Sequence, residues 1–165
     1  MKEKGFTLIE LVVVIGILSL LSASLITYSR AGEKQIVFFK EQSVLTSAVF
    51  RAKNLAISTY GRDEANSCGY GIHFNSPQEI IIFNDKISGG ECSSPGSYSD
   101  SGEDIEKIII DSRVKIAGSP SDFIFVPPEP TVSPGSEVSI RLELADDSSK
   151  SSVITISPAG QITVK

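Results

Sequence analysis

The chain has 165 residues and a formal net charge of −5 at pH 7, and this length suits one modest domain once a membrane-spanning segment is subtracted. The charge is uneven, because residues 61–165 hold sixteen Asp and Glu against eight Lys and Arg, a net charge of 8 − 16 = −8. A surface of that sign repels phosphate backbones, which argues against general nucleic-acid binding.

A long apolar segment begins near the N-terminus. From Phe6 to Tyr28 the only formal charge is that of Glu10. As a helix this segment would be roughly 34 Å long, at about 1.5 Å per residue, which is enough to cross a hydrocarbon core of about 30 Å. A carboxylate in such a span costs about 2.5 to 3.5 kcal/mol on insertion scales, so we expect Glu10 to have a function and a partner outside this segment.

The stretch Gly5-Phe6-Thr7-Leu8-Ile9-Glu10, behind a short polar head, resembles the class III signal and assembly helix of type IV prepilins and type II secretion pseudopilins. In that family a membrane peptidase cleaves after the glycine, and the new N-terminal residue is N-methylated. The resemblance implies cleavage between Gly5 and Phe6, methylation of Phe6 and an assembly role for Glu10. An ordinary secretory leader cleaved near 22–24 fits less well, because such a leader has an apolar region of only about 7 to 15 residues.

The charges around the apolar segment give a weak signal for its orientation. Lys2 and Lys4 precede the segment, whereas Arg30 and Lys34 follow it. The family resemblance implies an N-terminus in the cytoplasm, a single pass through the inner membrane and a C-terminal domain outside the cytoplasm. The charges are compatible with that orientation.

Residues 29–60 are predicted to continue the helix with one apolar face, so that a helix over 6–60 would end at Gly61. The stretch from Leu45 to Ile57 also resembles the corresponding helix half of GspH- and FimT-type minor pseudopilins. The apolar residues that recur at three- and four-residue steps are Phe38, Val44, Leu45, Ala48, Val49, Ala52, Leu55 and Ala56.

From Cys68 onward the pattern changes to short strands. A turn over 75–78 predicts a hairpin, and a second turn over 157–160 predicts another. In residues 138–144, alternation predicts a buried face of Val138, Ile140, Leu142 and Leu144 and a wet face of Ser139, Arg141 and Glu143. The predicted strands cover residues 70–74, 79–83, 105–110, 114–117, 123–126, 138–144, 153–156 and 161–164, and they form an antiparallel sheet or two small sheets on the helix.

Two connecting segments are rich in residues that break regular structure. Residues 88–102 are rich in glycine and serine, and residues 126–136 contain four prolines. We predict irregular surface loops in both. Such loops can recognise partners or can be plain connectors, and the sequence leaves both interpretations open.

The residue types that carry catalysis or bind metals are sparse. His73 is the only histidine, and we interpret it as a strand residue with a satisfied ring. Neither a catalytic residue nor a cofactor or metal site is predicted, and the acidic stretches 100–104 and 146–147 are interpreted as solvated turns rather than calcium sites. In an external domain Cys68 and Cys92 could form a disulfide, with two free buried thiols as the alternative.

The sequence therefore predicts an α+β, pilin-like fold, in which a long N-terminal helix with a transmembrane first half packs on an antiparallel β domain. The expected parts are a leader (1–5), a transmembrane assembly helix (6–28), an amphipathic continuation (29–60) and an extracytoplasmic β-rich domain (61–165). The expected function is that of a non-enzymatic minor pilin or pseudopilin subunit of a type IV pilus or type II secretion pseudopilus. The alternatives are a competence-type minor pilin that binds DNA and a membrane-anchored binding module.

The resemblance also implies a set of partners. These are the prepilin peptidase, other pilin or pseudopilin subunits, the inner-membrane assembly platform and membrane lipid. In that mechanism Glu10 pairs with the N-terminal ammonium of Phe6 on a neighbouring subunit, so that two buried charges neutralise each other. No cofactor is expected.

Overall fold

A computed structural model describes residues 7–59, 67–86 and 97–165, without the side chains of residues 26–31. The chain divides into two compact units, Met1–Ile36 and Val37–Lys165. Helix α1 (Leu8–Thr59) contributes to both. The helix begins two residues after the predicted start at residue 6. Gly61, the predicted stop, lies outside the described residues.

In the first unit the described residues form the start of α1. The window Leu8–Leu25 has a mean hydropathy of 2.5 and is long and apolar enough to cross a membrane. Each residue from Thr7 to Leu25 is exposed within the protein. Within residues 7–59, 67–86 and 97–165, nothing buries this apolar surface.

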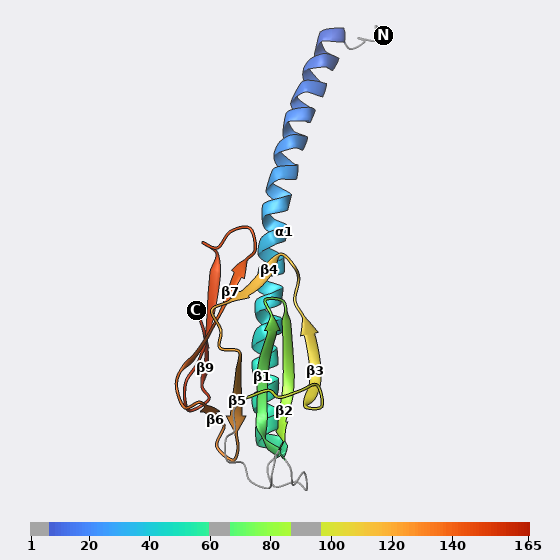
Figure 1. Ribbon diagram of the computed structural model, residues 1–165. Coiled ribbons are helices and arrows are strands. Elements are labelled where there is room, and N and C mark those ends of the chain that lie inside the picture. The colour runs from blue at the N-terminus through green and yellow to red at the C-terminus, as the bar shows by residue number, and fades with distance from the viewer. Residues whose placement is uncertain (1–6, 60–66, 87–96) are drawn as a thin grey trace. The chain divides into compact units, whose positions relative to one another are not determined.

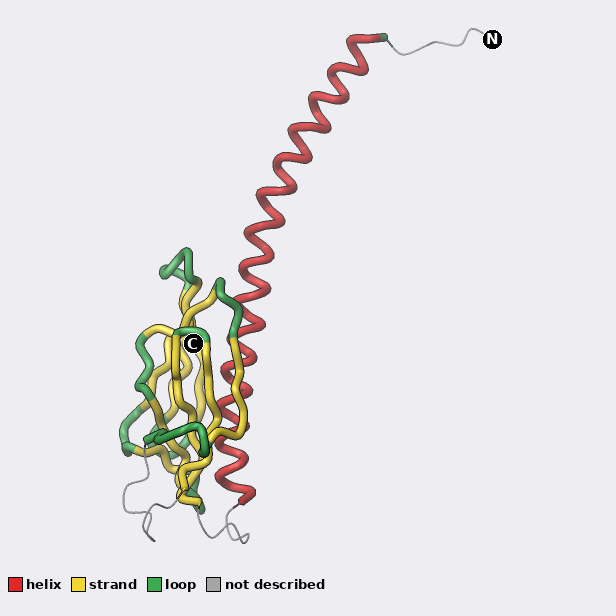
Figure 2. The backbone as a smooth tube through the Cα atoms, turned by 45° about the vertical axis from the view of Figure 1, so that its right-hand side comes forward, coloured by secondary structure: helices red, strands yellow, loops and turns green. Residues whose placement is uncertain are grey.

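The second unit contains two antiparallel sheets (Figures 1 and 2). In the five-stranded sheet the order is β3-β2-β1-β5-β6, and in the four-stranded sheet it is β4-β7-β8-β9. Neighbouring strands pair antiparallel throughout both sheets. The strands are β1 (Ser67–Ser76), β2 (Glu79–Lys86), β3 (Asp104–Ile109), β4 (Val114–Ala117), β5 (Asp122–Val126), β6 (Thr131–Ser133), β7 (Val138–Leu144), β8 (Ser151–Ile156) and β9 (Ile162–Val164).

The main core lies between the second half of α1 and the two sheets. The predicted apolar face of the helix supplies Leu45, Ala48, Val49, Ala52 and Ala56, which are buried together with side chains from both sheets. Removal of this apolar area from water stabilises the unit and ties this part of the helix to the strands.

The predicted hairpin is formed by β1 and β2, which are longer than the periodicity indicated. The added start of β1 contains Gly69, and Gly71 follows within the strand. A Cβ atom at Gly71 would collide with the backbone oxygen of Phe123 and lie 2.7 Å from the ring of Phe83. Glycine is therefore required at this position by the close approach of β5 and of an aromatic ring.

Strand β6 corrects the prediction that residues 126–136 are irregular. Val132 is buried and pairs with Phe125 of β5, and its amide also donates to the carbonyl of Pro158 at 2.9 Å. The prolines of this segment lie outside Thr131–Ser133. A short edge strand therefore forms between residues that could not themselves donate backbone hydrogen bonds.

The predicted wet face of β7 is also partly wrong. Ser139 and Arg141 are exposed, but Glu143 is buried. Strand β4 pairs beside it with Lys115 opposite Glu143, and Nζ of Lys115 lies 3.6 Å from the Glu143 carboxylate. The neighbouring strand and its cation thus allow a carboxylate to be buried at this position.

Candidate functional site

Helix α1 begins with a reciprocal hydrogen-bonded cap. The amide and the hydroxyl of Thr7 donate to Oε2 of Glu10 at 3.0 and 2.9 Å, and the amide of Glu10 donates to the Thr7 hydroxyl oxygen at 3.3 Å. This is the capping box that the spacing Thr-x-x-Glu allows. It satisfies backbone donors that a helix start leaves without partners in the helix.

Glu10 was expected to have its partner outside the apolar segment. The expectation is wrong for hydrogen bonds, because Thr7 lies within the segment and donates to the carboxylate. Thr7 supplies hydrogen bonds to the carboxylate but no charge. An ionised carboxylate has about four acceptor positions, so the cap is compatible with further donors. The charged partner of Glu10 remains a prediction.

The hydroxyl groups in the apolar part of α1 are satisfied within the helix. Ser19, Ser22 and Ser24 donate to the backbone oxygens of Ile15, Leu18 and Leu20 at 2.8, 2.8 and 3.1 Å. Polar groups in hydrocarbon need internal partners. These bonds therefore suit the helix to lipid or to an apolar bundle of helices.

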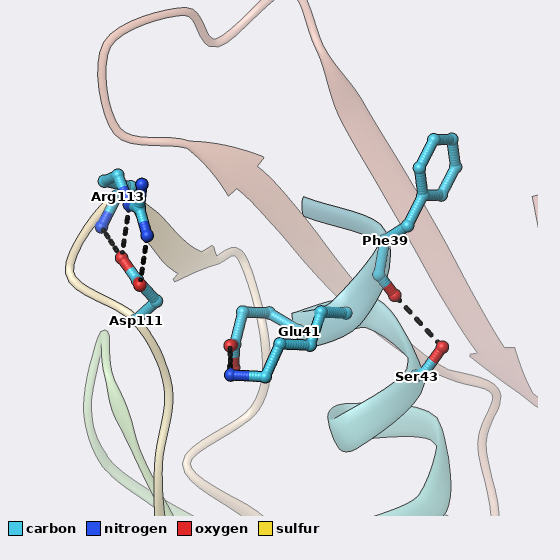
Figure 3. A network of polar contacts seen from close by, with 6 residues as sticks. Phe39, Glu41, Ser43, Asp111 and Arg113 are labelled. Carbon is cyan, nitrogen blue, oxygen red and sulfur yellow. Dashed lines mark hydrogen bonds and ion pairs between the residues drawn. The ribbon is translucent and has the colours of Figure 1, made fainter. Parts of the chain in front are cut away.

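In the second unit α1 also has an exposed side, which we call the saddle and define by Phe39, Ser43, Ser47 and Phe50. Phe39 and Phe50 are 64% and 45% exposed. Between them Ser43 and Ser47 are exposed, and the Ser43 hydroxyl donates to the backbone oxygen of Phe39 at 3.0 Å (Figure 3). The helix pattern had indicated the buried face and missed this one, although aromatic residues at positions 39 and 50 lie outside the buried stripe.

Two open grooves adjoin the saddle, and both are lined by Ser43 and Ser47. The groove toward β3 has a volume of about 610 Å³ and is also lined by Lys40, Arg51 and Glu106. The groove toward β9 has a volume of about 640 Å³ and reaches Val164. Arg51 and Glu106 form an ion pair at 2.7 Å that links α1 to β3.

Tyr98, in the segment before β3, is a residue that sequence reasoning missed. Tyr98 packs against the small cluster of Ile81, Phe83 and Ile124. Its hydroxyl donates to Asp104 at 2.7 Å, and its amide donates to Asp122 at 3.0 Å. The described end of the predicted 88–102 loop is therefore anchored to the sheet, and residues 88–96 lie outside the described residues.

The hydrogen bond to Asp104, together with burial and nearby carboxylates, raises the pKa of Tyr98 to about 12. For Asp104 burial alone would raise the pKa, but the hydrogen bonds from Tyr98 and Lys107 outweigh it and lower the pKa. The cluster is thus most stable with a protonated tyrosine and an ionised aspartate.

His73 departs from the satisfied ring that was expected. Its Nδ1 is buried without a hydrogen-bond partner, and its ring stacks on Tyr98 with centroids 4.3 Å apart. The stacking comes from residues 97–103 folding over the sheet, which periodicity does not reveal. His73 therefore packs as an aromatic residue in this cluster.

The acidic segments serve local structure. Asp100 accepts a hydrogen bond from the amide of Gly102 at 2.6 Å, and Asp147 accepts one from the amide of Ser149 at 3.1 Å. At the β3–β4 turn the side chain and amide of Arg113 bind Asp111 and hold its pKa well below the usual range (Figure 3). Among the described residues, no group of three or more His, Cys, Asp or Glu could hold a metal ion.

The structure describes only part of the remaining candidate residues. Cys68 is buried in β1, whereas Cys92, its predicted disulfide partner, lies outside the described residues. Gly5 and Phe6 also lie outside them. The cleavage, the methylation and the cysteine pairing remain predictions.

Known proteins are similar to this chain at its N-terminus and in its fold. Residues 1–26 match the family model of the prokaryotic N-terminal methylation motif. The structure is similar to a crystal structure of the type IV minor pilin FimU of Pseudomonas aeruginosa PAO1, with a TM-score of 0.52 and 14% identity, covering 74% of this chain and 88% of that chain. The chain carries the prepilin methylation motif and a pilin fold.

A second crystal form of FimU gives a TM-score of 0.50 and 15% identity over 77% of this chain and 92% of that chain. Among curated proteins, none matches this sequence. The α+β pilin fold predicted from the sequence is confirmed, and the methylation motif matches the N-terminal stretch that carries the family resemblance. This fold places a β domain on the second half of an N-terminal helix.

Proposed function

We propose that this chain is a minor pilin or pseudopilin subunit that is cleaved, N-methylated and assembled through α1. One observation carries the proposal: the methylation motif over residues 1–26 leads into an apolar helix that contains Glu10 and belongs to a FimU-like fold. A leader that is removed with its apolar region would have no use for a helix that continues into the globular core. The proposed role is structural and not enzymatic.

In this proposal Glu10 pairs with the methylated ammonium of Phe6 on a neighbouring subunit. The Thr7 bonds keep the carboxylate at the first turn of the helix. Because an isolated charge in an apolar bundle is costly, joining the two charges favours one axial position of each subunit relative to the next. The Thr7 cap also lowers the cost of holding Glu10 in lipid before assembly.

The proposed location and partners follow from the same helix. The leader comprises residues 1–5, the membrane helix 6–28, its amphipathic continuation 29–60 and the extracytoplasmic domain 61–165. Before assembly the helix crosses the cytoplasmic membrane with the globular unit outside, in contact with lipid, the prepilin peptidase and the assembly platform. The FimU likeness favours a type IV pilus, and a type II secretion pseudopilus remains the alternative machine.

A disulfide between Cys68 and Cys92 belongs to the proposal. The external compartment is oxidising, Cys68 is buried at the start of β1, and among the described residues no cysteine is free. The bond would tie residues 87–96 to the first hairpin. Thiol titration of unfolded, non-reduced protein is expected to find no reactive thiol, and two reactive thiols would exclude the bond.

Processing is the direct test of the proposed function. Intact-mass and N-terminal analysis of protein from membranes is expected to give a chain that starts at Phe6 with a methylated amine. Replacing Gly5 by leucine should block cleavage and leave the leader attached. A mature protein that starts near Leu25 would instead identify a secretory leader and reject the proposal.

A further inference from the structure

Strand β3 lies at an edge of the five-stranded sheet, where it pairs with β2 on one side and, among the described residues, with no strand on the other (Figure 1). Directly after β3 the amide of Ile110 donates to the carbonyl of Gln78, beside β2, at 2.9 Å. In an antiparallel pair, successive residues direct their main-chain groups alternately toward and away from the partner strand. Lys107 and Ile109 therefore direct their N–H and C=O groups away from β2, toward the free edge.

Exposed apolar side chains lie along this free edge. Ile109 is 79% exposed, the largest value for a large apolar side chain in the described part of Val37–Lys165. Ile105 is also exposed, on the same face of the strand, and Lys107 lies between the two. A lysine on an edge strand opposes pairing with apolar strands, because pairing would cover its charge. A strand that pairs with β3 therefore has to offer a carboxylate to Lys107.

The groove toward β3 adjoins this edge on the face of the sheet that packs on α1. Its volume is about 610 Å³, and its apolar lining residues are Val44, Ala48 and Ile108. Side chains alternate between the two faces of a strand, so a strand added beside β3 would direct every second side chain toward the groove. The groove thus offers such a strand an apolar contact in addition to main-chain hydrogen bonds.

The ion pairs around β3 indicate the sign of the charge that a partner meets. In each pair the cation is more exposed than the carboxylate. The side chains are 70% and 3% exposed in the pair Lys40–Glu41 and 52% and 13% exposed in the pair Lys107–Asp104, and Arg51 is likewise more exposed than Glu106. An approaching chain therefore meets positive charge here, although the globular part as a whole is acidic.

A second copy of β3 does not meet these requirements. Two copies that pair antiparallel with their free edges together and overlap over 105–109 place Lys107 opposite Lys107, and like charges directly opposite each other are destabilising. Centring the pair on position 106 brings Glu106 opposite Glu106. Centring it on position 108 leaves only 107–109 of each strand paired.

We propose that the free edge of β3 binds an extended acidic peptide segment of another protein as an added strand. The main-chain groups of Lys107 and Ile109 hydrogen-bond to the peptide, its apolar side chains enter the groove beside Ile108, and a carboxylate faces Lys107. In this mode main-chain bonds give affinity and side-chain contacts give specificity. The inference goes beyond the proposed function and does not depend on it, because cleavage, methylation and assembly through the first part of α1 use other residues.

The first test measures peptide binding to the full-length chain in detergent. The probe is a fluorescent synthetic peptide, Val-Thr-Val-Glu-Val-Thr-Val, which as a strand presents its valines on one face and its glutamate between two threonines on the other. Fluorescence anisotropy should show saturable binding that is about fivefold tighter than that of the same peptide with lysine in place of the glutamate.

Charge reversal in the protein provides the matched control for that preference. Lys107→Glu should reverse it, so that the lysine peptide binds more tightly than the glutamate peptide. Lys150→Glu, at an exposed position outside both grooves, should leave the preference unchanged. Equal affinity of the wild type for the two peptides, or the same preference in Lys107→Glu as in the wild type, would overturn the proposal.

The second test asks whether the peptide binds as a strand and leaves the protein unchanged. Methylation of alternate amide nitrogens of the glutamate peptide removes the donors on one edge of the strand and keeps those on the other. Methylation of one alternate set should weaken binding about tenfold, and methylation of the other set should change it by no more than about twofold. Equal loss with both sets, or loss with neither, would contradict strand addition.

The third test locates the contact at Ile109. Ile109→Pro removes the N–H group that faces the free edge, at a position where proline is compatible with a strand, and should weaken binding of the glutamate peptide about tenfold. Ile109→Ala keeps this N–H group and should weaken binding less. Wild-type binding by Ile109→Pro would overturn the proposal. So would a photo-crosslinking amino acid at position 109 that links two copies of this chain and not the labelled peptide.

Discussion

Two stretches of α1 form the same secondary structure under different conditions. In Leu8–Leu25 the whole helix surface is exposed and apolar, and the serine hydroxyls bind the helix's own carbonyls. In residues 37–59 one face is buried under two sheets, while the other is exposed and contains the saddle. The second stretch is therefore stabilised by the fold, whereas the first needs lipid or neighbouring helices for its apolar surface.

The largest effect is expected from a substitution that removes the assembly role of the first stretch and leaves the second stretch unchanged. Glu10→Ala should leave membrane insertion intact or improve it, because a residue that is costly in lipid is removed. Incorporation should fail, since loss of one member of a buried charge pair costs about 3 to 5 kcal/mol. Crosslinking to partner subunits measures incorporation. Recovery of Glu10→Ala at the wild-type level, with normal cleavage, would contradict the pairing mechanism.

The next largest effect is expected from the same leucine-to-alanine substitution made once in each stretch. Leu45→Ala should destabilise the globular unit by about 2 to 5 kcal/mol, because Leu45 is fully buried and truncation leaves a cavity. Leu18→Ala, at an exposed position in the first stretch, should leave that stability unchanged. Pulse proteolysis in urea on the full chain in detergent measures both. Equal loss in the two variants would show that the stretches fold as one unit.

A smaller effect tests how α1 is tied to the sheets. Gly160 has a φ of +72°, its oxygen accepts a hydrogen bond from Nζ of Lys53 at 2.9 Å, and a Cβ atom there would collide with the carbonyl of Pro130. Gly160→Ala should cost about 1 to 3 kcal/mol in strain and displacement.

Gly135→Ala is the matched control for that substitution. Gly135 has a φ of +82° but open space around it, so the alanine there meets only the backbone strain. The same urea titration should show the smaller loss for Gly135→Ala. An equal loss in both variants would mean that the contact with Pro130 adds nothing to the stability of the unit.

The smallest expected effect is confined to alkaline pH and to the globular unit. The folded protein raises the pKa of Tyr98 from 10.0 to about 12, so between these values the unfolded chain binds fewer protons than the folded one. The stabilisation from the Tyr98 hydroxyl is therefore complete below pH 10 and is lost as pH rises toward 12. Thermal unfolding against pH should show this decline in the wild type and not in Tyr98→Phe. A decline of the same size in both would assign it to other groups.

Much of the fold could be predicted because periodicity reports which face of an element is buried. The helix face that includes Leu45 and Ala52 and the buried side of β7 followed from spacing, and the first hairpin followed from the turn residues at 75–78. Strand β6 was missed because prolines near Val132 outweigh three residues of strand pattern. Tyr98 was missed because a single aromatic residue in a glycine- and serine-rich segment has no periodicity.

Part of the candidate site could be predicted from the sequence, and part could not. Glu10 was predicted as an assembly residue from the sequence, because a lone carboxylate in an apolar run is costly and therefore informative, and that role remains a prediction. Its bonds to Thr7 depend on a rotamer that only the three-dimensional structure gives. The saddle was missed because exposed phenylalanines and serines on a helix resemble ordinary surface until the buried face is known.

Local residue order was enough to predict the apolar helix with its single carboxylate, the change from helical to strand period and the acidic charge of the globular part. These are properties of the local order of residues, which fix amphipathic faces and the cost of transfer from water. The tertiary structure decided that Glu143 is buried beside Lys115, that Tyr98 stacks on His73 and that Gly160 meets Pro130. Each of these contacts joins residues from different elements, and which elements become neighbours depends on how two sheets and a helix pack together.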